Sequence, residues 1–336
     1  MKRHVISVTL AAACAALMGT AGTAPAAAAD AYVFKFAHAQ PLTSVRHKSM
    51  ELFKEDLEKA TSGRIKVELF GAGVLGNESE LMDMVKVGNL QGTRGSQFAK
   101  ANPKFLIYTL PFLFQDTDSV LAAMRGPVGQ RIAAASKANG FHIPATGVAG
   151  GFRQFTTDKR PIETVDDVKG LKLRTPPIDS IVQTIKALDA SPQSVPYGET
   201  YMALKTGVVD GQENPCSNIV EMKFYEVQKY MSLVNYQIHP DPLFVSLKWY
   251  EGLPADLKAA FDASSRKAME WSDTHWLASE TDYLKTLEGK LKVNAITAQN
   301  RANFVAKVKP VWTHYVQQGA FSEAEINEVL AAAKKK

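Results

Sequence analysis

The stretch Gly170-Leu171-Lys172-Leu173-Arg174-Thr175-Pro176-Pro177 has the pattern of a short β-strand that two prolines bring to an end. Its leucines alternate with Lys172 and Arg174, so a half-buried strand places these two cations on the same face. The prolines stop the strand because neither can donate a hydrogen bond to a neighbouring strand. Arg174 therefore stands where open α/β sheets bind ligands, and its planar guanidinium can hold a carboxylate through two hydrogen bonds. Considered alone, the stretch favours an ordinary salt bridge at the surface for this arginine.

Strands and helices alternate along the rest of the chain, which predicts an α/β fold with mostly parallel sheets. We expect strands, some with an adjoining loop or turn, over 32–37, 64–70, 105–114, 141–149, 194–196, 208–214 and 236–248. We expect helices over 44–60, 79–87, 118–139, 178–188, 199–206, 300–318 and 322–333. A helical pattern from Ala255 to about Gly289 is long enough to run across two lobes.

The first 29 residues have the composition of a secretory signal peptide. A positive start over 2–4 precedes a short apolar core over 5–18, and small residues over 27–29 suit a cleavage site. The apolar core is too short to span a bilayer, and no later run of about 18 uncharged apolar residues follows. We therefore predict a soluble protein that is exported after cleavage of this segment.

Charge and cysteine content exclude several classes of protein. Loss of the signal peptide removes Lys2 and Arg3 and no acid, so the formal charge falls from +5 to +3. With a nearly balanced charge and no basic stripe, nucleic-acid binding has little support. Cys216 is then the only cysteine, so an intramolecular disulfide is impossible. The remaining length suggests two domains or one large α/β unit, either of which can bury a sufficient core without a disulfide.

A glycine-rich stretch, Gly71-Ala72-Gly73-Val74-Leu75-Gly76, matches the G-x-G-x-x-G pattern of dinucleotide-binding proteins. In those proteins the glycines open a helix directly, and an acid follows about 20 residues later. Here the helical pattern begins only at Ser79, and the segment Leu90-Gln91-Gly92 contains no acid. We therefore interpret the stretch as a turn and predict no nucleotide cofactor.

Motifs of catalysis and of metal binding are few. No G-x-S-x-G, H-E-x-x-H or P-loop pattern occurs, and the six histidines of the mature chain never fall at metal-ligand spacing. His239, beside Pro240 and Asp241, is the best isolated candidate for a site residue, although a loop or core histidine is the simpler interpretation. Cys216 would need a paired base to act as a nucleophile, and no neighbour in the sequence supplies one. The sequence therefore predicts no catalytic residue, no metal site and no cofactor.

The remaining polar candidates suit binding better than catalysis. Arg153 and Arg174 each stand at the end of a predicted strand. Asn214 lies in a polar turn, and Tyr197 is an amphipathic aromatic residue ahead of a helix. Charge-assisted donors, an amide and an aromatic wall are what a small carboxylated solute requires. In an exported α/β protein, this set favours a ligand-binding role for Arg174.

Several longer motifs occur in the order typical of a known family. They are LFGAGVLGNESELMDMVKVG, LPFLF, FRQFTTDKRPIETVDDVKGLKLRTPP, VPYGETYMALKTGVVDGQENP, EVQKYMSL and YEGLPADLK, and together they cover nearly the whole mature chain. On these motifs the chain resembles the extracytoplasmic solute-binding proteins of TRAP (tripartite ATP-independent periplasmic) transporters, the DctP family. The combination of DDVKGLKLRTP with ALKTGVVDGQENP is the most specific part of the resemblance.

The resemblance implies a two-lobed α/β clamp like that of periplasmic binding proteins, with a long C-terminal helix bracing both lobes. We assign residues 30–150 plus 240–279 to lobe I and residues 151–239 plus 280–333 to lobe II. The resemblance also implies that the protein captures a small organic acid anion and delivers it to the TRAP membrane permease subunits. We expect a monomer with no nucleic-acid partner.

The same motifs imply ligand-binding roles for four residues. Arg174 matches the main carboxylate-binding arginine of the LKLR-x-P motif, and Arg153 matches the second arginine, in FRQFT. Asn214 matches the asparagine of DGQEN. Tyr197 matches the aromatic position before GETY, which is usually Phe in sialate binders.

Other positions depart from the sialate-binding members of the family. The segment 93–97 has no acid where those members carry one near Ser96, and Pro177 replaces a frequent asparagine. Both differences argue against sialate. Arg94 is a candidate third cation for a dicarboxylate, with a surface position as the alternative. Gln40, in the loop after the first strand, is expected to add polar contacts.

We therefore predict a periplasmic binding protein whose ligand is a sugar acid, a C4-dicarboxylate or a 2-oxo acid, since each offers a carboxylate to Arg174. Two alternatives stay open at this point. Within transport, the chain could serve an ABC importer or a sensor kinase, which neighbouring genes would distinguish. Outside transport, it could be an exported enzyme acting on a sugar acid, which turnover of a bound acid would reveal.

Overall fold

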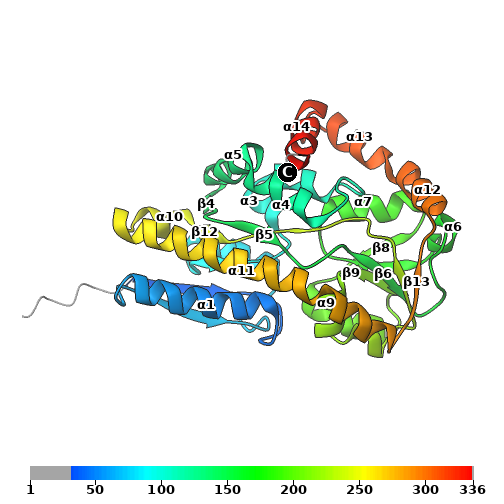
Figure 1. Cartoon of the computed structure of the whole chain (residues 1–336), viewed down its shortest axis with the longest axis horizontal. Helices are drawn as coiled ribbons and strands as arrows, with labels where there is room; N and C mark the ends of the chain where they lie inside the picture. Colours follow the sequence, from blue (N-terminus) through cyan, green and yellow to red (C-terminus); the bar gives the residue numbers. More distant parts are fainter. Residues whose placement is uncertain (1–31, 335–336) are drawn as a thin grey trace, which may run out of the picture.

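The computed structural model describes residues 32–334 and places most strands in two separate β-sheets with helices around them (Figure 1). The first sheet has the order β2 (Ile65–Phe70), β1 (Tyr32–Ala37), β3 (Gly92–Thr93), β12 (Phe244–Ser246) and β4 (Phe141–His142). The second has the order β13 (Lys292–Ala295), β10 (Tyr230–Leu233), β6 (Gln154–Thr157), β9 (Gly211–Asn214), β7 (Lys172–Thr175) and β8 (Ser191–Ser194). The two-lobed α/β architecture confirms the predicted fold class. The predicted signal peptide lies outside the described residues.

Both sheets are mixed, so the expectation of mostly parallel sheets was wrong. In the first sheet, β1 runs parallel to β2 and β3, whereas β12 runs antiparallel to β3 and β4. In the second sheet, β7 is parallel to β8 and β9, whereas β6 is antiparallel to β9 and β10. The physical reason is that β12 and β6 enter their sheets from segments that cross between the lobes, and not after a crossover helix.

Three segments connect the two sheets. The chain leaves the first sheet through β5 (Thr146–Val148) and returns from β10 through β11 (Pro240–Pro242). These two strands pair with each other in antiparallel fashion, so two of the crossings lie side by side. Arg153 stands directly before β6 and His239 directly before β11, so both occupy crossing segments. The loop expected over 239–242 is therefore a strand from Pro240 onward.

The third crossing is the helix α11 (Ala255–Glu288), whose 34 residues give a length of about 50 Å. Its first half buries Leu257 and Phe261 in the core of the first sheet. Its last turn buries Leu287 in a separate cluster beside the second sheet. The helix contacts α1 (Val45–Ala60) and α9 (Cys216–Glu221), as Figure 1 shows. The prediction of a bracing helix is confirmed.

Proline interrupts three elements that the sequence pattern predicted to be continuous. The helix expected over 118–139 is divided into α4 (Thr117–Arg125) and α5 (Pro127–Ala135), because Pro127 has no amide hydrogen and favours the first position of a new helix. Pro310 likewise separates α12 (Ala298–Val308) from α13 (Pro310–Gln317). The strand expected over 141–149 forms β4 and β5 on either side of Pro144. The apolar segment 105–114 is mostly buried, but its first part is a 3-10 helix, η1 (Pro103–Thr109), and not a strand.

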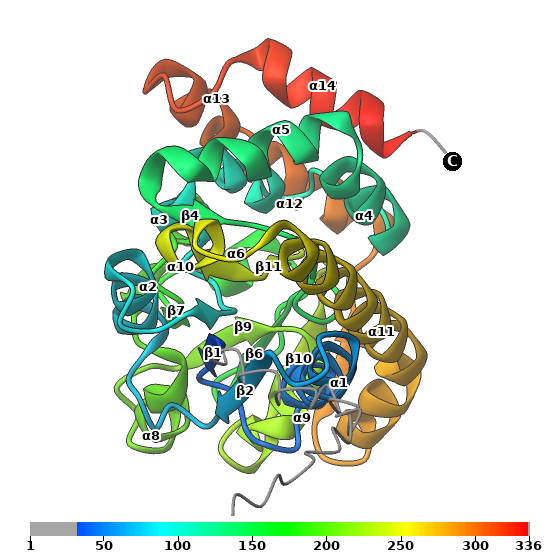
Figure 2. The ribbon, with the colours of Figure 1, turned by 90° about the vertical axis from the view of Figure 1, so that its left-hand side faces the viewer.

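The remaining helices are short and lie around the sheets. They are α2 (Glu78–Val87), α3 (Phe98–Ala101), η2 (Ser136–Asn139), α6 (Val165–Val168), α7 (Asp179–Ala187), η3 (Tyr197–Glu199), α8 (Thr200–Lys205), η4 (Phe224–Glu226), α10 (Leu247–Glu251) and α14 (Glu323–Ala333). Helix α14 packs against α4 and α5 (Figure 2). Helix α13 packs against α7, so the last helices touch elements assigned to both lobes. The exact lobe boundaries stay a prediction. Within residues 32–334, no helix combines the length and apolar character that a membrane span needs.

The glycine-rich stretch forms a loop, as predicted, and α2 begins after it. The Asn77 side chain caps this helix by accepting hydrogen bonds from the amides of Ser79 (2.9 Å) and Glu80 (3.2 Å). The Glu80 carboxylate accepts a hydrogen bond from the Asn77 amide in return (2.8 Å), which completes a capping box. This cap fixes the first turn of α2, which carries Glu78 and Ser79.

Candidate functional site

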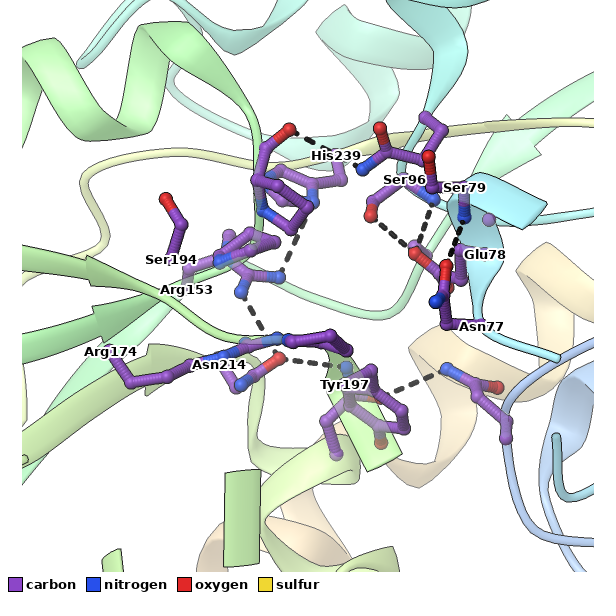
Figure 3. Close-up of a pocket in the computed structure, with 18 of the residues that line it drawn as sticks. Asn77, Glu78, Ser79, Ser96, Arg153, Arg174, Ser194, Tyr197, Asn214 and His239 are labelled. Atoms are coloured by element: carbon purple, nitrogen blue, oxygen red, sulfur yellow. Dashed lines mark hydrogen bonds between the residues drawn. The ribbon is translucent and has the colours of Figure 1, made fainter. Parts of the chain in front are cut away.

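A cavity of about 310 Å³ lies between the two sheets and is lined from both sides. The polar side chains of its first wall come from the side of the first sheet: Gln40, Arg46, Asn77, Glu78, Ser79, Ser96 and Gln97. Those of its second wall come from the side of the second sheet: Arg153, Arg174, Ser194, Tyr197, Asn214 and Asn218. His239, from a crossing segment, also lines the cavity. Figure 3 shows Glu78 and Ser96 across the cavity from Arg174.

Arg174 lies in β7 and is 1 % exposed. Its Nε and Nη2 atoms both donate to the carbonyl oxygen of Val195, at 2.9 and 2.7 Å, which fixes the guanidinium plane. Its Nη1 atom has no hydrogen-bond partner, and the guanidinium no carboxylate partner, among residues 32–334. Burial lowers the pKa of Arg174 to about 10, so the group stays cationic at neutral pH. The cavity therefore contains a rigid cation without a counter-charge.

Arg153 is also buried, but it is paired. Its guanidinium forms an ion pair with Glu213, through Nε to one carboxylate oxygen and through Nη2 to the other at 2.9 Å. Burial alone would lower the pKa of Arg153, but the Glu213 carboxylate outweighs this effect and raises it. Glu213 also accepts a hydrogen bond from the Tyr236 hydroxyl at 2.6 Å. The charge of Arg153 is therefore compensated within the protein.

Asn214 and Tyr197 line the second wall beside these arginines. The Asn214 Oδ1 atom accepts hydrogen bonds from Arg153 Nη2 at 3.1 Å and from Asn218 Nδ2 at 2.9 Å. The Tyr197 ring packs edge-on against Phe224, and its hydroxyl is buried with no hydrogen-bond partner in the described part of the chain. Burial raises the pKa of Tyr197 well above its usual value, so this hydroxyl remains protonated.

His239 lines the cavity as a neutral ring. Its Nδ1 atom lies 3.4 Å from Arg153 Nη1, while its Nε2 atom is buried and lacks a hydrogen-bond partner within residues 32–334. Burial and the positive charges of Arg153, Arg174 and Arg46 hold the pKa of His239 well below its usual value. If Nδ1 accepts from Arg153, the Nε2–H group is a free donor to a ligand. The one histidine singled out from the sequence thus lies at the cavity, although a loop or core role was the simpler interpretation.

Two hydrogen bonds join the walls directly. Gln40 Nε2, in the first wall, donates to Asn218 Oδ1 at 3.3 Å. Gln97 Nε2 donates to the carbonyl oxygen of Pro177 at 3.4 Å. The Gln40 Oε1 atom is buried and unpartnered in the described chain, so it can accept a hydrogen bond from a ligand. These two hydrogen bonds therefore connect the walls at the cavity.

The comparison with protein families identifies this architecture. The model of "Bacterial extracellular solute-binding protein, family 7", named DctP, matches residues 36–318. The chain belongs to this family. The resemblance stated from the motifs is thereby confirmed.

Relatives of this DctP-family chain extend over most of its length. A "Solute-binding protein" of Verminephrobacter eiseniae is 30 % identical over 286 residues, which cover 84 % of each chain. An uncharacterized protein of Sinorhizobium fredii is 34 % identical over 220 residues, or 65 % of this chain, and the match spans only 40 % of that protein.

Two solved structures show the same fold. The crystal structure of a TRAP periplasmic solute-binding protein from Bordetella, with density interpreted as pantoate, has a TM-score of 0.84 and 28 % identity, and covers 90 % of this chain and 99 % of its own. The sugar acid binding protein DctPAm of Advenella mimigardefordensis, in complex with galactonate, has a TM-score of 0.86 and 29 % identity. That match covers 91 % of this chain and 98 % of DctPAm.

Arg94, proposed from the sequence as a third cation for a ligand, does not line the cavity. It is completely buried, and its Nη2 atom donates to Asp241 Oδ2 at 2.6 Å. Its Nη1 atom donates to the Ser49 hydroxyl at 2.7 Å. Both predictions for Arg94, a ligand contact and a surface position, were therefore wrong. Asp241 and Ser49 bind its guanidinium in the protein interior, away from the cavity. Asp241 in turn binds Arg46 (3.1 Å to Nη2), and Arg46 does line the cavity.

Sequence reasoning missed Arg46 and Glu78. Arg46 lies in the first turn of α1, where Ser44 caps the helix by accepting a hydrogen bond from the His47 amide. Its Nη1 atom is 3.6 Å from Glu78 Oε1, which is an ion-pair distance but not a hydrogen bond. Both residues belong to the first turn of a helix that follows a strand. Ligands of α/β proteins often bind at this edge of a sheet, so this position was the sequence feature that could have identified the two residues.

The described residues offer little for catalysis. No group of three or more His, Cys, Asp or Glu within residues 32–334 has the geometry to hold a metal ion. Cys216 does not line the cavity, and burial raises the pKa of its thiol far above the usual range. The polar side chains that line the cavity instead offer hydrogen-bond donors, hydrogen-bond acceptors and the guanidinium of Arg174.

Proposed function

We propose that this chain captures a small organic acid anion in the cavity between its lobes and delivers it to the membrane permease subunits of a TRAP transporter. One observation carries this proposal: Arg174 is a buried, oriented guanidinium that has no carboxylate partner of its own in the described chain. A buried cation without a counter-charge is costly, and a carboxylate ligand removes that cost. The ligands of the two solved relatives, pantoate and galactonate, both carry a carboxylate.

Within the cavity, each predicted residue has a distinct task. Arg174 holds the carboxylate, and Arg153, whose charge Glu213 compensates, positions Asn214 through a hydrogen bond to its Oδ1 atom. Tyr197 and His239 offer hydrogen bonds to the rest of the ligand, because the Tyr197 hydroxyl and His239 Nε2 have no hydrogen-bond partner in the described chain. Closure of lobe I (30–150 plus 240–279) on lobe II (151–239 plus 280–333) would exclude water and strengthen each contact.

Export through a cleaved signal peptide, a periplasmic location and a monomeric state complete the proposal. The rival roles, a binding subunit for an ABC importer or a sensor, differ in their partners and not in the cavity. Adjacent genes for a large and a small TRAP permease subunit would support the proposal, and a neighbouring ATPase gene would contradict it. Catalytic turnover of a bound sugar acid would favour the enzyme alternative.

The Arg174→Lys variant tests the carboxylate site. Lysine keeps the charge but loses the planar pair of donors, so the affinity for the best acid found in a thermal-shift screen should fall about tenfold or more. Lys172→Arg is the matched control, since Lys172 lies in the same strand but is exposed and does not line the cavity. Calorimetric titration of the wild type and both variants would measure the change. An Arg174→Lys affinity equal to that of the wild type would contradict the assignment.

A further inference from the structure

The arginines that line the cavity are paired with carboxylates of the described chain at every position but one. Arg153 is neutralised by Glu213, and Arg46 and Arg94 share Asp241. Glu78, at 3.6 Å from Arg46, supplies the second negative charge of that cluster, so its two arginines and two carboxylates cancel. Arg174 alone among the cavity-lining arginines has no carboxylate partner within the described residues. The cavity therefore presents one uncompensated positive charge, which corresponds to one carboxylate on the ligand.

A second carboxylate on the ligand would meet the first wall, where the charge is unfavourable. Glu78 lies there, across the cavity from Arg174, with only 14 % of its side chain exposed (Figure 3). Its Oε2 atom accepts hydrogen bonds from the Ser96 amide, at 3.0 Å, and from the Ser96 hydroxyl. These bonds hold the Glu78 carboxylate in place as a hydrogen-bond acceptor in this wall. The nearest cation, Arg46, is already hydrogen-bonded to Asp241, so no spare positive charge of the described chain awaits a second anion there.

The neutral polar atoms of the cavity are complementary to hydroxyl groups on a ligand. Gln40 Oε1 is a buried acceptor without a donor in the described chain, and Glu78 is an acceptor as well. The Tyr197 hydroxyl and His239 Nε2 are buried and also lack partners there. A carboxylate can only accept hydrogen bonds, whereas a hydroxyl can donate to Gln40 and Glu78 and accept from Tyr197 and His239. Each unpartnered group is costly when a ligand fails to satisfy it.

We infer that the ligand is a polyhydroxylated acid with a single carboxylate, of the sugar-acid class, and that Glu78 excludes dicarboxylates. This inference rests on the proposed function and narrows it. The carboxylate binds Arg174, and the hydroxylated carbons extend toward Glu78, Ser96 and Gln40 in the first wall. The cavity volume of about 310 Å³ lies at the small end of ligand sites, which suits a single sugar acid.

Galactonate and galactarate form a matched pair of probes, because they differ only in whether the far end of the same hydroxylated chain is a hydroxymethyl group or a carboxylate. Calorimetric titration of the wild-type protein should give at least about tenfold tighter binding of galactonate. Gluconate and glucarate provide a second pair, and succinate provides a dicarboxylate without hydroxyl groups. Succinate should bind more weakly than either hexonate.

The Glu78→Gln variant tests whether the charge of Glu78 excludes dicarboxylates. Glutamine keeps the size and the acceptor for Ser96 but removes the charge, so the preference for galactonate over galactarate should shrink at least about fivefold. Asp83→Asn is the matched control: it removes one negative charge from the same helix, but at an exposed residue paired with Lys100. This control should leave the preference unchanged, and circular dichroism would verify that both variants are folded.

The outcomes separate the inference from the function on which it rests. If a dicarboxylate binds the wild type as tightly as the hexonates do, the inference is wrong but organic-acid binding stands. The same conclusion follows if a 2-oxo acid without hydroxyl groups binds more tightly than every other acid tested. An equal preference in the wild type and Glu78→Gln would exclude the role of Glu78. Failure of every organic acid to bind would overturn the proposed function itself.

Discussion

The two walls of the cavity differ in the elements that build them and in their charge. The second wall holds Arg174 and Arg153 at the ends of strands in one sheet, and in the proposed function it binds the charged group of the ligand. The first wall presents helix first turns, with Glu78 and Arg46, and its described residues carry no uncompensated positive charge. A strand end supported by a sheet gives a cation a fixed orientation, whereas helix starts and loops are easily altered without disturbing a core. We therefore expect the second wall to define the class of ligand and the first wall to select within it.

This comparison predicts that equivalent substitutions of Glu78, which lines the first wall, and of Glu213, which pairs with Arg153 of the second wall, have very different costs. Glu213→Gln leaves Arg153 buried without its counter-charge and should lower the free energy of unfolding by about 3–5 kcal/mol. Glu78→Gln breaks only a long ion pair and should change it by about 1 kcal/mol or less. Urea denaturation of the ligand-free proteins would measure both. If both variants lost a similar amount of unfolding free energy, Glu213 would be no more important for stability than Glu78, which would contradict this comparison of the walls.

The groups behind the two walls should also respond to pH in opposite directions. His38, at the end of β1, is neutral and buried: its Nδ1 atom accepts from the Gln40 amide at 3.2 Å, and its Nε2 atom lies 2.9 Å from His47 Nδ1. Burial, with Arg46 next, lowers the pKa of His38 to about 2. The unfolded chain binds a proton below about pH 6.5 and the folded protein does not, so this residue weakens folding as the pH falls from about 6.5, by up to about 1.4 kcal/mol per pH unit.

Glu221, the last residue of α9, lies behind Tyr197 and has the opposite effect. Burial raises the pKa of its carboxyl to about 7, although the Val45 amide, Arg46, Tyr283 and Lys48 all act to lower it. The folded protein therefore retains this proton over a range where the unfolded chain has lost it. Folding weakens as the pH rises from about 4.5 to 7, again by up to about 1.4 kcal/mol per pH unit.

The variants His38→Gln and Glu221→Gln separate these two contributions. Relative to the wild type, His38→Gln should lose less stability when the pH falls from about 6.5 to 5, and Glu221→Gln should lose less when it rises from about 5 to 7. Urea denaturation at several pH values gives both slopes, and the difference from the wild type removes the contribution of the other titrating groups. If neither substitution changed the slope of unfolding free energy against pH, His38 and Glu221 would not be the source of the pH dependence.

The second wall was largely predictable from sequence, and the first was not. Arg174 could be placed because a strand pattern and two prolines fix where its side chain emerges. Arg94 was misjudged because its partner, Asp241, is 147 residues away in a crossing segment. No local pattern reveals that this carboxylate holds one arginine in the core and another, Arg46, at the cavity. Contacts between distant segments decide which arginine lines the cavity.

The fold showed the same division. The long helix and the first strand were predicted within a residue or two because their patterns are local. The strand directions were not, because β12 and β6 join their sheets after crossings whose geometry depends on the whole chain. The expected single helix over 118–139 was wrong for a local reason, since Gly126 and Pro127 were sufficient to predict a break.

The smallest predicted effect concerns the junction of the two walls. Gln40 donates one hydrogen bond from the first wall to Asn218 in the second, at 3.3 Å, and keeps a buried acceptor for the ligand. Gln40→Ala removes both, and a neutral hydrogen bond contributes about 0.5–1.5 kcal/mol, so ligand affinity should fall about 3- to 10-fold. Gln91→Ala is a suitable control, because Gln91 is an amide of the same lobe that does not line the cavity.

The ligand series distinguishes the two tasks of Gln40. If its acceptor binds a ligand hydroxyl, Gln40→Ala should weaken galactonate more than an acid without hydroxyl groups; if Gln40 only joins the walls, all ligands should weaken alike. Calorimetric titration with both kinds of acid would decide between these results. Because a lost wall junction affects every ligand and a lost acceptor affects only hydroxylated ones, the size of the difference measures how far the first wall selects by direct contact.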